Sequence, residues 1–184
     1  MRRPPAHALA VAGLFLLGAP VVAEARPWYA PDHTKLQLAG NVGFLSPGVG
    51  WTFARRFDAD LFVGWVPEAV GGTDIFAVTG KLTWSPWALE AGPWRLHPFT
   101  AALQITYTFG DQYFIVPRFP FPPTALRAGV GFGVAASRPL WGRRVGLYAE
   151  LGAVDLGLGY WLTNRGSIRA SEVFSLALGA RLEW

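Results

Sequence analysis

The sequence predicts an all-β fold, an eight-stranded antiparallel up-and-down transmembrane β-barrel. Segments of about ten residues alternate between apolar and polar or small side chains, which is the pattern of strands in such a barrel. The chain of 184 residues is 52% hydrophobic and 15% aromatic but only 15% charged, a balance that soluble domains rarely show. Beyond the N-terminal region, no segment offers the roughly 18 uninterrupted apolar residues of a membrane-spanning helix. These observations favour a membrane protein that crosses with strands.

Residues 1–25 have the pattern of a secretory signal peptide. Two arginines open the segment, an apolar stretch follows over residues 8–17, and a small-residue Ala-x-Ala cleavage site ends at Ala25. The apolar stretch is shorter than the ~20 residues of a membrane helix, which argues against a retained anchor. We therefore expect cleavage after Ala25 and a barrel domain over residues 26–184.

The first half of the mature chain contains four alternating segments. They cover residues 35–45, 49–56, 59–65 and 75–84. In each segment every second side chain is apolar, so that a strand would have one apolar face. In the first segment that face is made by Leu36, Leu38, Val42 and Phe44. Turn-forming residues separate the segments. Turns are expected at Ser46-Pro47-Gly48 and Phe57-Asp58, and a loop that contains Gly71-Gly72 is expected over residues 67–74.

The second half contains four more such segments, joined by longer connections. These strands are expected over residues 99–109, 125–135, 145–153 and 171–184. The first of them alternates most regularly, with Leu103 and Ile105 on one face and Gln104 on the other. Connections are expected over residues 85–98, 110–124, 137–144 and 154–170. Loops are normally polar, but the second connection carries aromatic side chains between prolines, which makes them candidates for an outer-loop interaction surface. The candidates are Tyr113, Phe114, Phe119 and Phe121.

The last strand ends in a pattern that resembles a known signal. Gly179, Leu182 and the terminal Trp184 resemble the C-terminal assembly signal of bacterial outer-membrane β-barrels. Ala177 stands where that signal prefers a polar residue. Over its mature length the chain also resembles small outer-membrane barrels of the OmpA/OmpX-like kind, in architecture and not through a subfamily motif. The resemblance implies a monomer in the bacterial outer membrane, with lipid, lipopolysaccharide and the barrel-assembly machinery as partners.

The positions of the tryptophans agree with an orientation in which both ends of the mature chain lie at the periplasmic side of the outer membrane. With the N-terminus of the mature chain in the periplasm, an even number of strands brings the C-terminus back to the periplasmic side. Two groups of tryptophans then lie at the membrane surfaces, namely Trp84, Trp87, Trp94, Trp141 and Trp184 at the periplasmic rim and Trp65 and Trp161 at the outer rim. Aromatic girdles at both interfaces are typical of such barrels, because amphipathic rings favour the headgroup level.

The polar face of the strands is expected to line the lumen, because the other face is almost wholly apolar and would contact lipid. Five ionisable side chains with inward parity are Asp60, Lys81, Arg127, Glu150 and Arg181. A charge in so narrow a lumen loses most of its hydration and requires a partner. We therefore expect Glu150 to pair with Arg127 and Arg181 on neighbouring strands. Asp60 should neutralise Lys81, so that the whole cluster plugs the lumen.

The leading functional interpretation is a non-enzymatic, porin-like but plugged barrel with a structural or surface-interaction role. The lack of cysteine excludes a thiolate nucleophile and a thiolate metal site. The Asp32-His33 pair is too small a ligand set to predict a metal, and no cofactor is expected. The formal charge of +4 is spread along the chain without a Lys/Arg run, so a nucleic-acid partner is not expected.

Two alternatives remain open. The first is a lipid A-modifying enzyme, an acyl hydrolase or acyltransferase, because two eight-stranded outer-membrane barrels have such activities. The deacylase among them uses a Ser-His-Glu arrangement on the outer half of its barrel. Here His7 would leave with the signal peptide, and His33 and His97 map near the periplasmic rim. The second alternative is a narrow pore, which requires an unblocked lumen.

Overall fold

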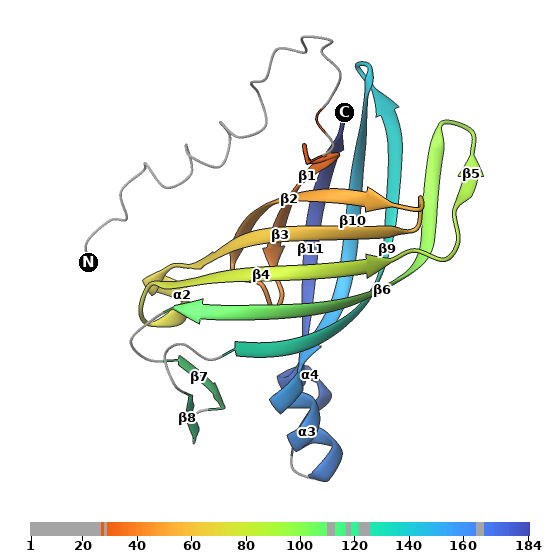
Figure 1. Ribbon diagram of the computed structural model, residues 1–184. Coiled ribbons are helices and arrows are strands. Elements are labelled where there is room, and N and C mark those ends of the chain that lie inside the picture. Colours follow the sequence, from red (N-terminus) through yellow and green to blue (C-terminus); the bar gives the residue numbers. More distant parts are fainter. Residues whose placement is uncertain (1–26, 28, 110–112, 117–118, 122–125, 165–167) are drawn as a thin grey trace. The chain divides into compact units, whose positions relative to one another are not determined.

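The computed structural model describes residues 27, 29–109, 113–116, 119–121, 126–164 and 168–184 (Figure 1). The chain divides into two units, and the second, Pro31–Trp184, holds all the elements considered below. The expected signal peptide lies outside the described residues, so its cleavage stays a prediction.

Eight strands form a closed antiparallel β-barrel, which confirms the predicted eight-stranded up-and-down architecture. The barrel strands are β1 (His33–Ala39), β2 (Leu45–Phe53), β3 (Phe57–Val66), β4 (Ile75–Trp84), β6 (Trp94–Phe109), β9 (Leu126–Leu140), β10 (Arg143–Val154) and β11 (Phe174–Glu183). Consecutive barrel strands are hydrogen-bonded neighbours, and β1 pairs with β11 to complete the circle. We call the end where β1 begins and β11 ends the terminal end, and the opposite end the loop end.

Six short elements extend the barrel. They are β5 (Leu89–Ala91), β7 (Tyr113–Val116), β8 (Phe119–Phe121), α2 (Glu68–Gly71), α3 (Asp155–Thr163) and α4 (Ala170–Val173). Strand β5 pairs with the start of β6 at the terminal end, and β7 and β8 form a separate two-stranded sheet. Helices α3 and α4 connect β10 to β11 at the loop end (Figure 1). Among the described residues, no helix combines the length and apolar character needed to cross a membrane.

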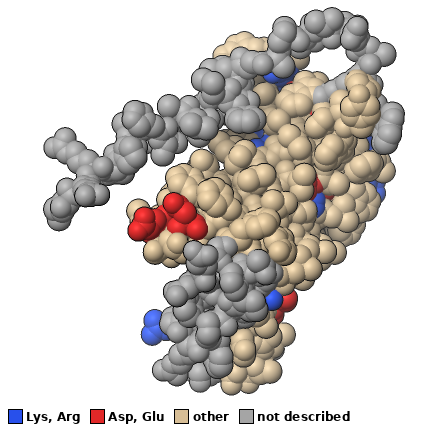
Figure 2. Space-filling view, turned by 60° about the vertical axis from the view of Figure 1, so that its left-hand side comes forward, with Lys and Arg blue, Asp and Glu red and all other residues tan. Residues whose placement is uncertain are grey.

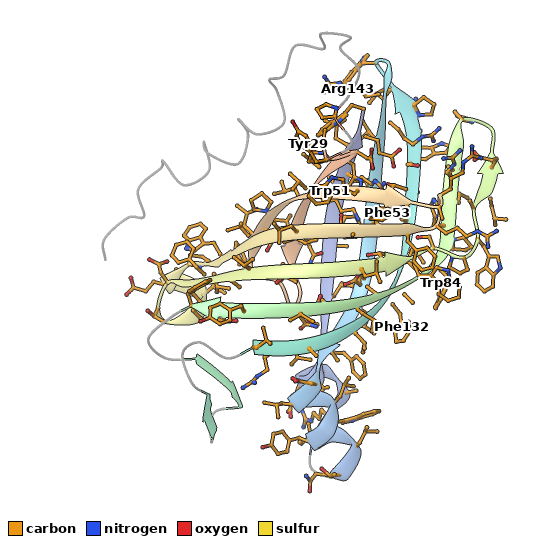
Figure 3. All side chains as sticks on the ribbon, in the orientation of Figure 1. Tyr29, Trp51, Phe53, Trp84, Phe132 and Arg143 are labelled. Carbon is orange, nitrogen blue, oxygen red and sulfur yellow. The ribbon has the colours of Figure 1, made fainter. Side chains whose placement is uncertain are left out.

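Side-chain exposure alternates along the strands as the sequence predicts. On β6, Leu103 is 61% exposed on the outside, whereas Gln104 is 6% exposed in the lumen. On β4, buried and exposed side chains alternate over the whole strand. The exposed positions are large and apolar, and Figure 2 shows a broad face with few charged atoms. Figure 3 shows Phe53 and Trp84 at the ends of β2 and β4, directed away from the lumen. The barrel is therefore apolar outside and polar inside.

The first hairpin differs from the prediction. The Ser46-Pro47-Gly48 stretch lies within β2 and pairs with β1, and the turn is formed earlier, over residues 40–44. Backbone φ angles of 82° at Gly40 and 146° at Gly43 allow this tight turn, which glycine adopts without a Cβ clash. Proline has no N–H to donate to a neighbouring strand. Pro47 is tolerated in β2 because it has no ladder partner on β3 that would need this donor. As a result Val42 is buried at the loop end and does not share the outward face.

Three of the longer connections also differ from the prediction. The expected connection over residues 85–98 contains β5 and the first residues of β6. The turn expected over residues 137–144 is only Trp141-Gly142, because β9 and β10 continue almost to the tip of their hairpin. The last connection contains α3, and the final strand starts at Phe174, because α4 occupies the residues before it.

Candidate functional site

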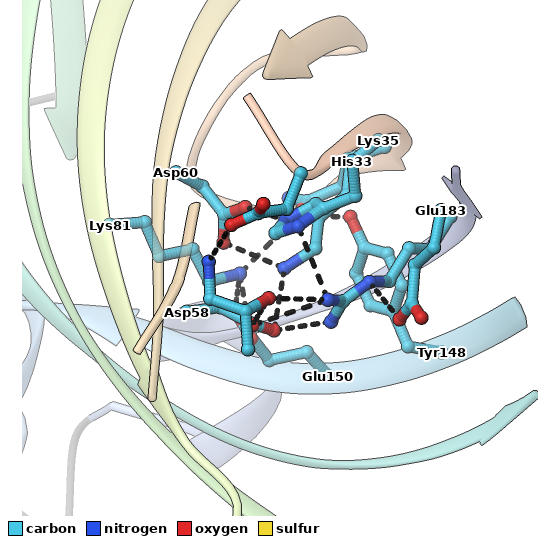
Figure 4. Close-up of polar contacts among 12 residues, drawn as sticks. His33, Lys35, Asp58, Asp60, Lys81, Tyr148, Glu150 and Glu183 are labelled. Carbon is cyan, nitrogen blue, oxygen red and sulfur yellow. Dashed lines mark hydrogen bonds and ion pairs between the residues drawn. The ribbon is translucent and has the colours of Figure 1, made fainter. Parts of the chain in front are cut away.

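The candidate site is a network of polar side chains inside the barrel, near the terminal end (Figure 4). Strands β1, β3, β4, β10 and β11 contribute to it, each through residues of inward parity. We define the lumen network as His33, Lys35, Gln37, Asp58, Asp60, Lys81, Tyr148, Glu150 and Arg181. The network brings together four of the five predicted cluster residues, and Arg127 is the exception.

The centre of the lumen network is an ion pair between Lys81 and Glu150. The Lys81 Nζ lies 2.7 Å from Glu150, and both side chains are almost fully buried. Because β4 and β10 are not neighbours in the sheet, this contact crosses the lumen. Lys81 Nζ also donates to Gln37 Oε1 at 3.3 Å, and the Tyr148 hydroxyl donates to the same oxygen at 3.2 Å. These contacts join three strands across the barrel interior.

The prediction that Glu150 pairs with Arg127 and Arg181 is wrong, because its ion-pair partner is Lys81. Arg127 pairs along the ladder with Thr106, whereas Glu150 pairs with Gly133, six positions away on the same strand β9. Arg127 is thus too far along the barrel to meet Glu150, and its Nη1 donates to the Leu126 carbonyl oxygen at 3.0 Å.

Arg181 makes a different ion pair, with Asp58, and its guanidinium also contacts Glu183 at 2.8 Å. Lys81 lies directly opposite Asp60 on the ladder, yet Asp60 does not take it as a salt-bridge partner. Asp60 is instead held by Lys35, whose Nζ is 2.7 Å from Asp60 Oδ2. The long side chain of Lys81 is therefore left to extend to Glu150.

His33 is a residue of the network that the sequence argument missed. It is fully buried, with Nε2 at 2.8 Å from Asp60 Oδ1. Arg181 Nη2 lies 3.2 Å from His33 Nδ1. A guanidinium can only donate, so Nδ1 accepts and the proton of the neutral ring is on Nε2, from which it is donated to Asp60. Alternation along the strand could have placed His33 in the lumen, because residue 33 has the same parity as Lys35 and Gln37. It was missed because the strand was expected to start two residues later, at residue 35.

Glycines give the large side chains of the network their space. A Cβ placed on Gly179 would lie 2.2 Å from Cζ of Tyr148, and one on Gly131 would lie 2.7 Å from Oε1 of Glu150. Tyr148 therefore lies directly over the backbone of the last strand. Gly179, predicted as part of the assembly signal, thus also has a packing role inside the barrel.

The network separates two cavities within the described barrel. The larger, of ≈ 680 Å³, lies at the terminal end and is lined by Lys81, Tyr148 and Glu150 among others. The smaller, of ≈ 330 Å³, lies at the loop end and is lined by residues such as Ala77 and Thr106. Thr79, fully buried between Lys81 and Ala77 on β4, donates to or accepts from Thr106 Oγ1 at 2.8 Å. Polar packing thus fills the middle of the lumen.

The chemistry of the network is that of packed ion pairs. Both ring nitrogens of His33 are engaged, and His97 contacts the Trp87 carbonyl oxygen through Nδ1 at 3.1 Å. Within the described part of the chain, neither histidine has a hydrogen bond to a serine. The same part of the chain holds no group of three or more His, Cys, Asp or Glu side chains placed to bind a metal.

The predicted assembly signal lies at the junction of the two ends of the barrel domain. Trp184 Nε1 donates to the Pro31 carbonyl oxygen at 2.9 Å. Leu182 pairs with Thr34 and Gly179 with Gln37 in the β1–β11 ladder. The outer-loop candidates Tyr113, Phe114, Phe119 and Phe121 belong to β7 and β8, and their side chains lie outside the described residues.

Comparison with solved structures finds a remote likeness in fold. No family model matches the chain, and no curated protein matches it in sequence. The crystal structure of the N-terminal β-barrel domain of Pseudomonas aeruginosa OprF aligns with 84% of this chain and 98% of that domain, with a TM-score of 0.46 and 9% identity. The function is therefore argued from the residues of this chain.

Proposed function

We propose that the chain is an integral, monomeric protein of the bacterial outer membrane, with a structural or surface-interaction role and a plugged lumen. The observation that carries this proposal is the reversed polarity of the barrel. Leu103 and other large apolar side chains are exposed outside, while charged side chains are buried inside. A water-soluble barrel would bury its apolar side chains and expose its polar ones, whereas lipid favours the arrangement seen here.

Further features of the sequence support the proposed location. The N-terminal pattern over residues 1–25 directs export. The C-terminal residues Gly179, Leu182 and Trp184 are the expected contact for the barrel-assembly machinery. Outer-membrane lipid and lipopolysaccharide are the proposed surroundings of the apolar outer face.

The proposed location can be tested by fractionation and by gel migration. The mature chain should appear in the outer-membrane fraction, starting at residue 26. Unboiled protein in mild detergent should migrate differently from boiled protein, because a closed barrel has no free edge at which unfolding can start. Recovery from the soluble fraction, with identical migration before and after boiling, would contradict the proposal.

Removal of Trp184 should reduce the amount of folded barrel in the outer membrane. The reason is that Trp184 ends the assembly signal and fastens β11 to Pro31. Signal-peptide cleavage should be unaffected, since it occurs at the other end of the chain. Trp141→Ala provides the control, because it removes an even more exposed tryptophan from the terminal end without touching β11. An equal loss of folded barrel in both variants would count against a specific role of the last residue.

A further inference from the structure

The larger of the two cavities, at the terminal end, has the size and lining of a ligand site. Its volume of ≈ 680 Å³ falls within the range of roughly 300–1,000 Å³ that is usual for small-molecule sites. The ion pair of Lys81 and Glu150 lies on its wall, and the β2–β3 turn lies at its rim through Arg55 and Arg56. The cavity is therefore large enough for an organic molecule that enters from the terminal end.

The charges that line this cavity leave two cations unpaired. Four of its cationic side chains form ion pairs inside the barrel or at its rim, namely Lys35, Lys81, Arg95 and Arg181. The side chains of Arg55 and Arg56 have no ion pair or hydrogen bond to any described residue. The lining also holds five carboxylates, Asp32, Asp58, Glu90, Glu150 and Glu183. Asp58, Glu90, Glu150 and Glu183 form ion pairs with other cations, and Asp32 accepts a hydrogen bond from the Thr52 backbone N–H. The lining thus has six cationic side chains against five carboxylates, and the two cations without an ion pair lie at the rim.

The turn that carries these arginines has an unfavourable sequence for its shape. Ala54 and Arg55 have φ angles of 49° and 57°, which is the left-handed region. The connection has three residues, 54–56, and positions with a left-handed φ prefer Gly, Asn or Asp. Residues held in such conformations tend to be found at functional sites, where their placement matters more than local stability. The turn keeps an arginine at the rim at a position where asparagine or glycine would be more stable.

The inner wall of the cavity provides hydroxyl groups. Thr83, Thr100 and Ser137 line it, and they are only 9%, 8% and 9% exposed. Their hydroxyls make no hydrogen bond to a described residue. The three hydroxyl oxygens are not among the fully buried unpartnered atoms, so they are accessible from the cavity, where water or a ligand with polar groups can bind them. They come from β4, β6 and β9, which form one continuous section of the wall.

We infer that this cavity binds a phosphate-bearing polyol. Arg55 and Arg56 bind the phosphate at the rim, because the guanidinium fork matches phosphate oxygens. Thr83, Thr100 and Ser137 bind the hydroxyl groups deeper in the cavity. Two sources present this chemistry, a free glycerol phosphate and the glycerophosphate headgroup of a phospholipid in the leaflet next to the terminal end. The second source rests on the proposed membrane location, and the first does not.

The free ligand is tested by calorimetric titration of the folded mature chain, in detergent without phosphate groups, with glycerol 3-phosphate. Saturable binding is expected. The double variant Arg55→Gln/Arg56→Gln should weaken it by about tenfold or more, since charge-assisted hydrogen bonds are the stronger ones. Thr100→Val, which replaces the hydroxyl by a methyl group, should weaken it by about threefold to tenfold. Arg169→Gln is the control, because Arg169 is exposed before α4 and does not line the cavity.

The lipid source is tested in nanodiscs that contain phosphatidylglycerol and phosphatidylcholine in equal amounts. Native mass spectrometry should show selective retention of phosphatidylglycerol, which the double arginine variant loses and Arg169→Gln keeps. Binding in either experiment with this dependence on Arg55 and Arg56 supports the inference and identifies the source. No binding in both experiments, or binding unchanged in the double variant, overturns it. Heat-dependent gel migration shows that each variant is folded, and the titration in detergent remains decisive even if the proposed location is wrong.

Discussion

A Glu150→Gln variant is expected to lose about 3–5 kcal/mol of unfolding free energy, because it leaves a buried cation without its counter-ion. Lys81 is almost fully buried, and its charge is neutralised by Glu150 at 2.7 Å. Glutamine fills the same space but carries no charge. The measurement is urea unfolding of the folded barrel in detergent or lipid, followed by tryptophan fluorescence.

Two further variants separate this effect from general damage. Replacing both partners, as in Lys81→Met/Glu150→Leu, should recover most of the lost stability, since it removes the buried charge together with its partner. Glu90→Gln, which removes a carboxylate from the exposed pair with Arg95, should change stability by less than about 1 kcal/mol. If Glu150→Gln were no worse than Glu90→Gln, the lumen network would not be a tightly packed plug.

Conductance measurements on the wild type, and stability and activity measurements on Glu150→Gln, test the pore and enzyme alternatives. The wild-type protein should conduct ions poorly in a planar bilayer, because polar packing separates the two cavities. Large, steady currents from the wild type would favour the narrow pore instead. A Glu150→Gln protein of unchanged stability that had lost an activity on lipid A would favour the enzyme.

A Leu103→Arg variant should be destabilised by about 2–4 kcal/mol if the outer face contacts lipid, because a charge near the middle of the bilayer loses its hydration. Leu103 is 61% exposed on β6. In water an arginine would be harmless at so exposed a position. Leu89→Arg is the matched control, since Leu89 is 55% exposed on β5, beyond the end of β4. Unfolding in lipid vesicles measures both. Equal and small effects would show that the apolar face is not in the membrane.

The fold was predictable because one physical pattern extends through the whole barrel. Apolar and polar side chains alternate with a period of two, and β6 shows the clearest case in Leu103 and Gln104. The first hairpin was misplaced because two stretches carry turn-forming residues, one at Gly40–Gly43 and one at Pro47-Gly48. Local propensity does not decide between them. The pairing of the strands decides between them, because Pro47 occupies a position in β2 where no N–H is required.

The lumen network was predictable in composition but not in pairing. Parity alone places Asp60, Lys81 and Glu150 in the lumen. Sequence reasoning then assigned partners from neighbouring strands, because ladder neighbours are the only contacts that strand order specifies. Lys81 instead reaches across the barrel to Glu150, through a long side chain whose direction depends on which carboxylates are already taken. His33 and Lys35 take Asp60, and only the folded interior shows that competition.

The pairing of β1 with β11 has a consequence for the order of events during folding. The contact between Trp184 and Pro31 joins positions 153 residues apart, so the seam closes a loop that contains almost the whole barrel. Contacts between distant parts of a chain make folding slow, because a long loop must be ordered before they are gained. Until the seam forms, both β1 and β11 are open edges that can pair with other chains. We therefore expect closure of this seam to be a slow step of folding, during which the unclosed barrel is prone to pair with other chains.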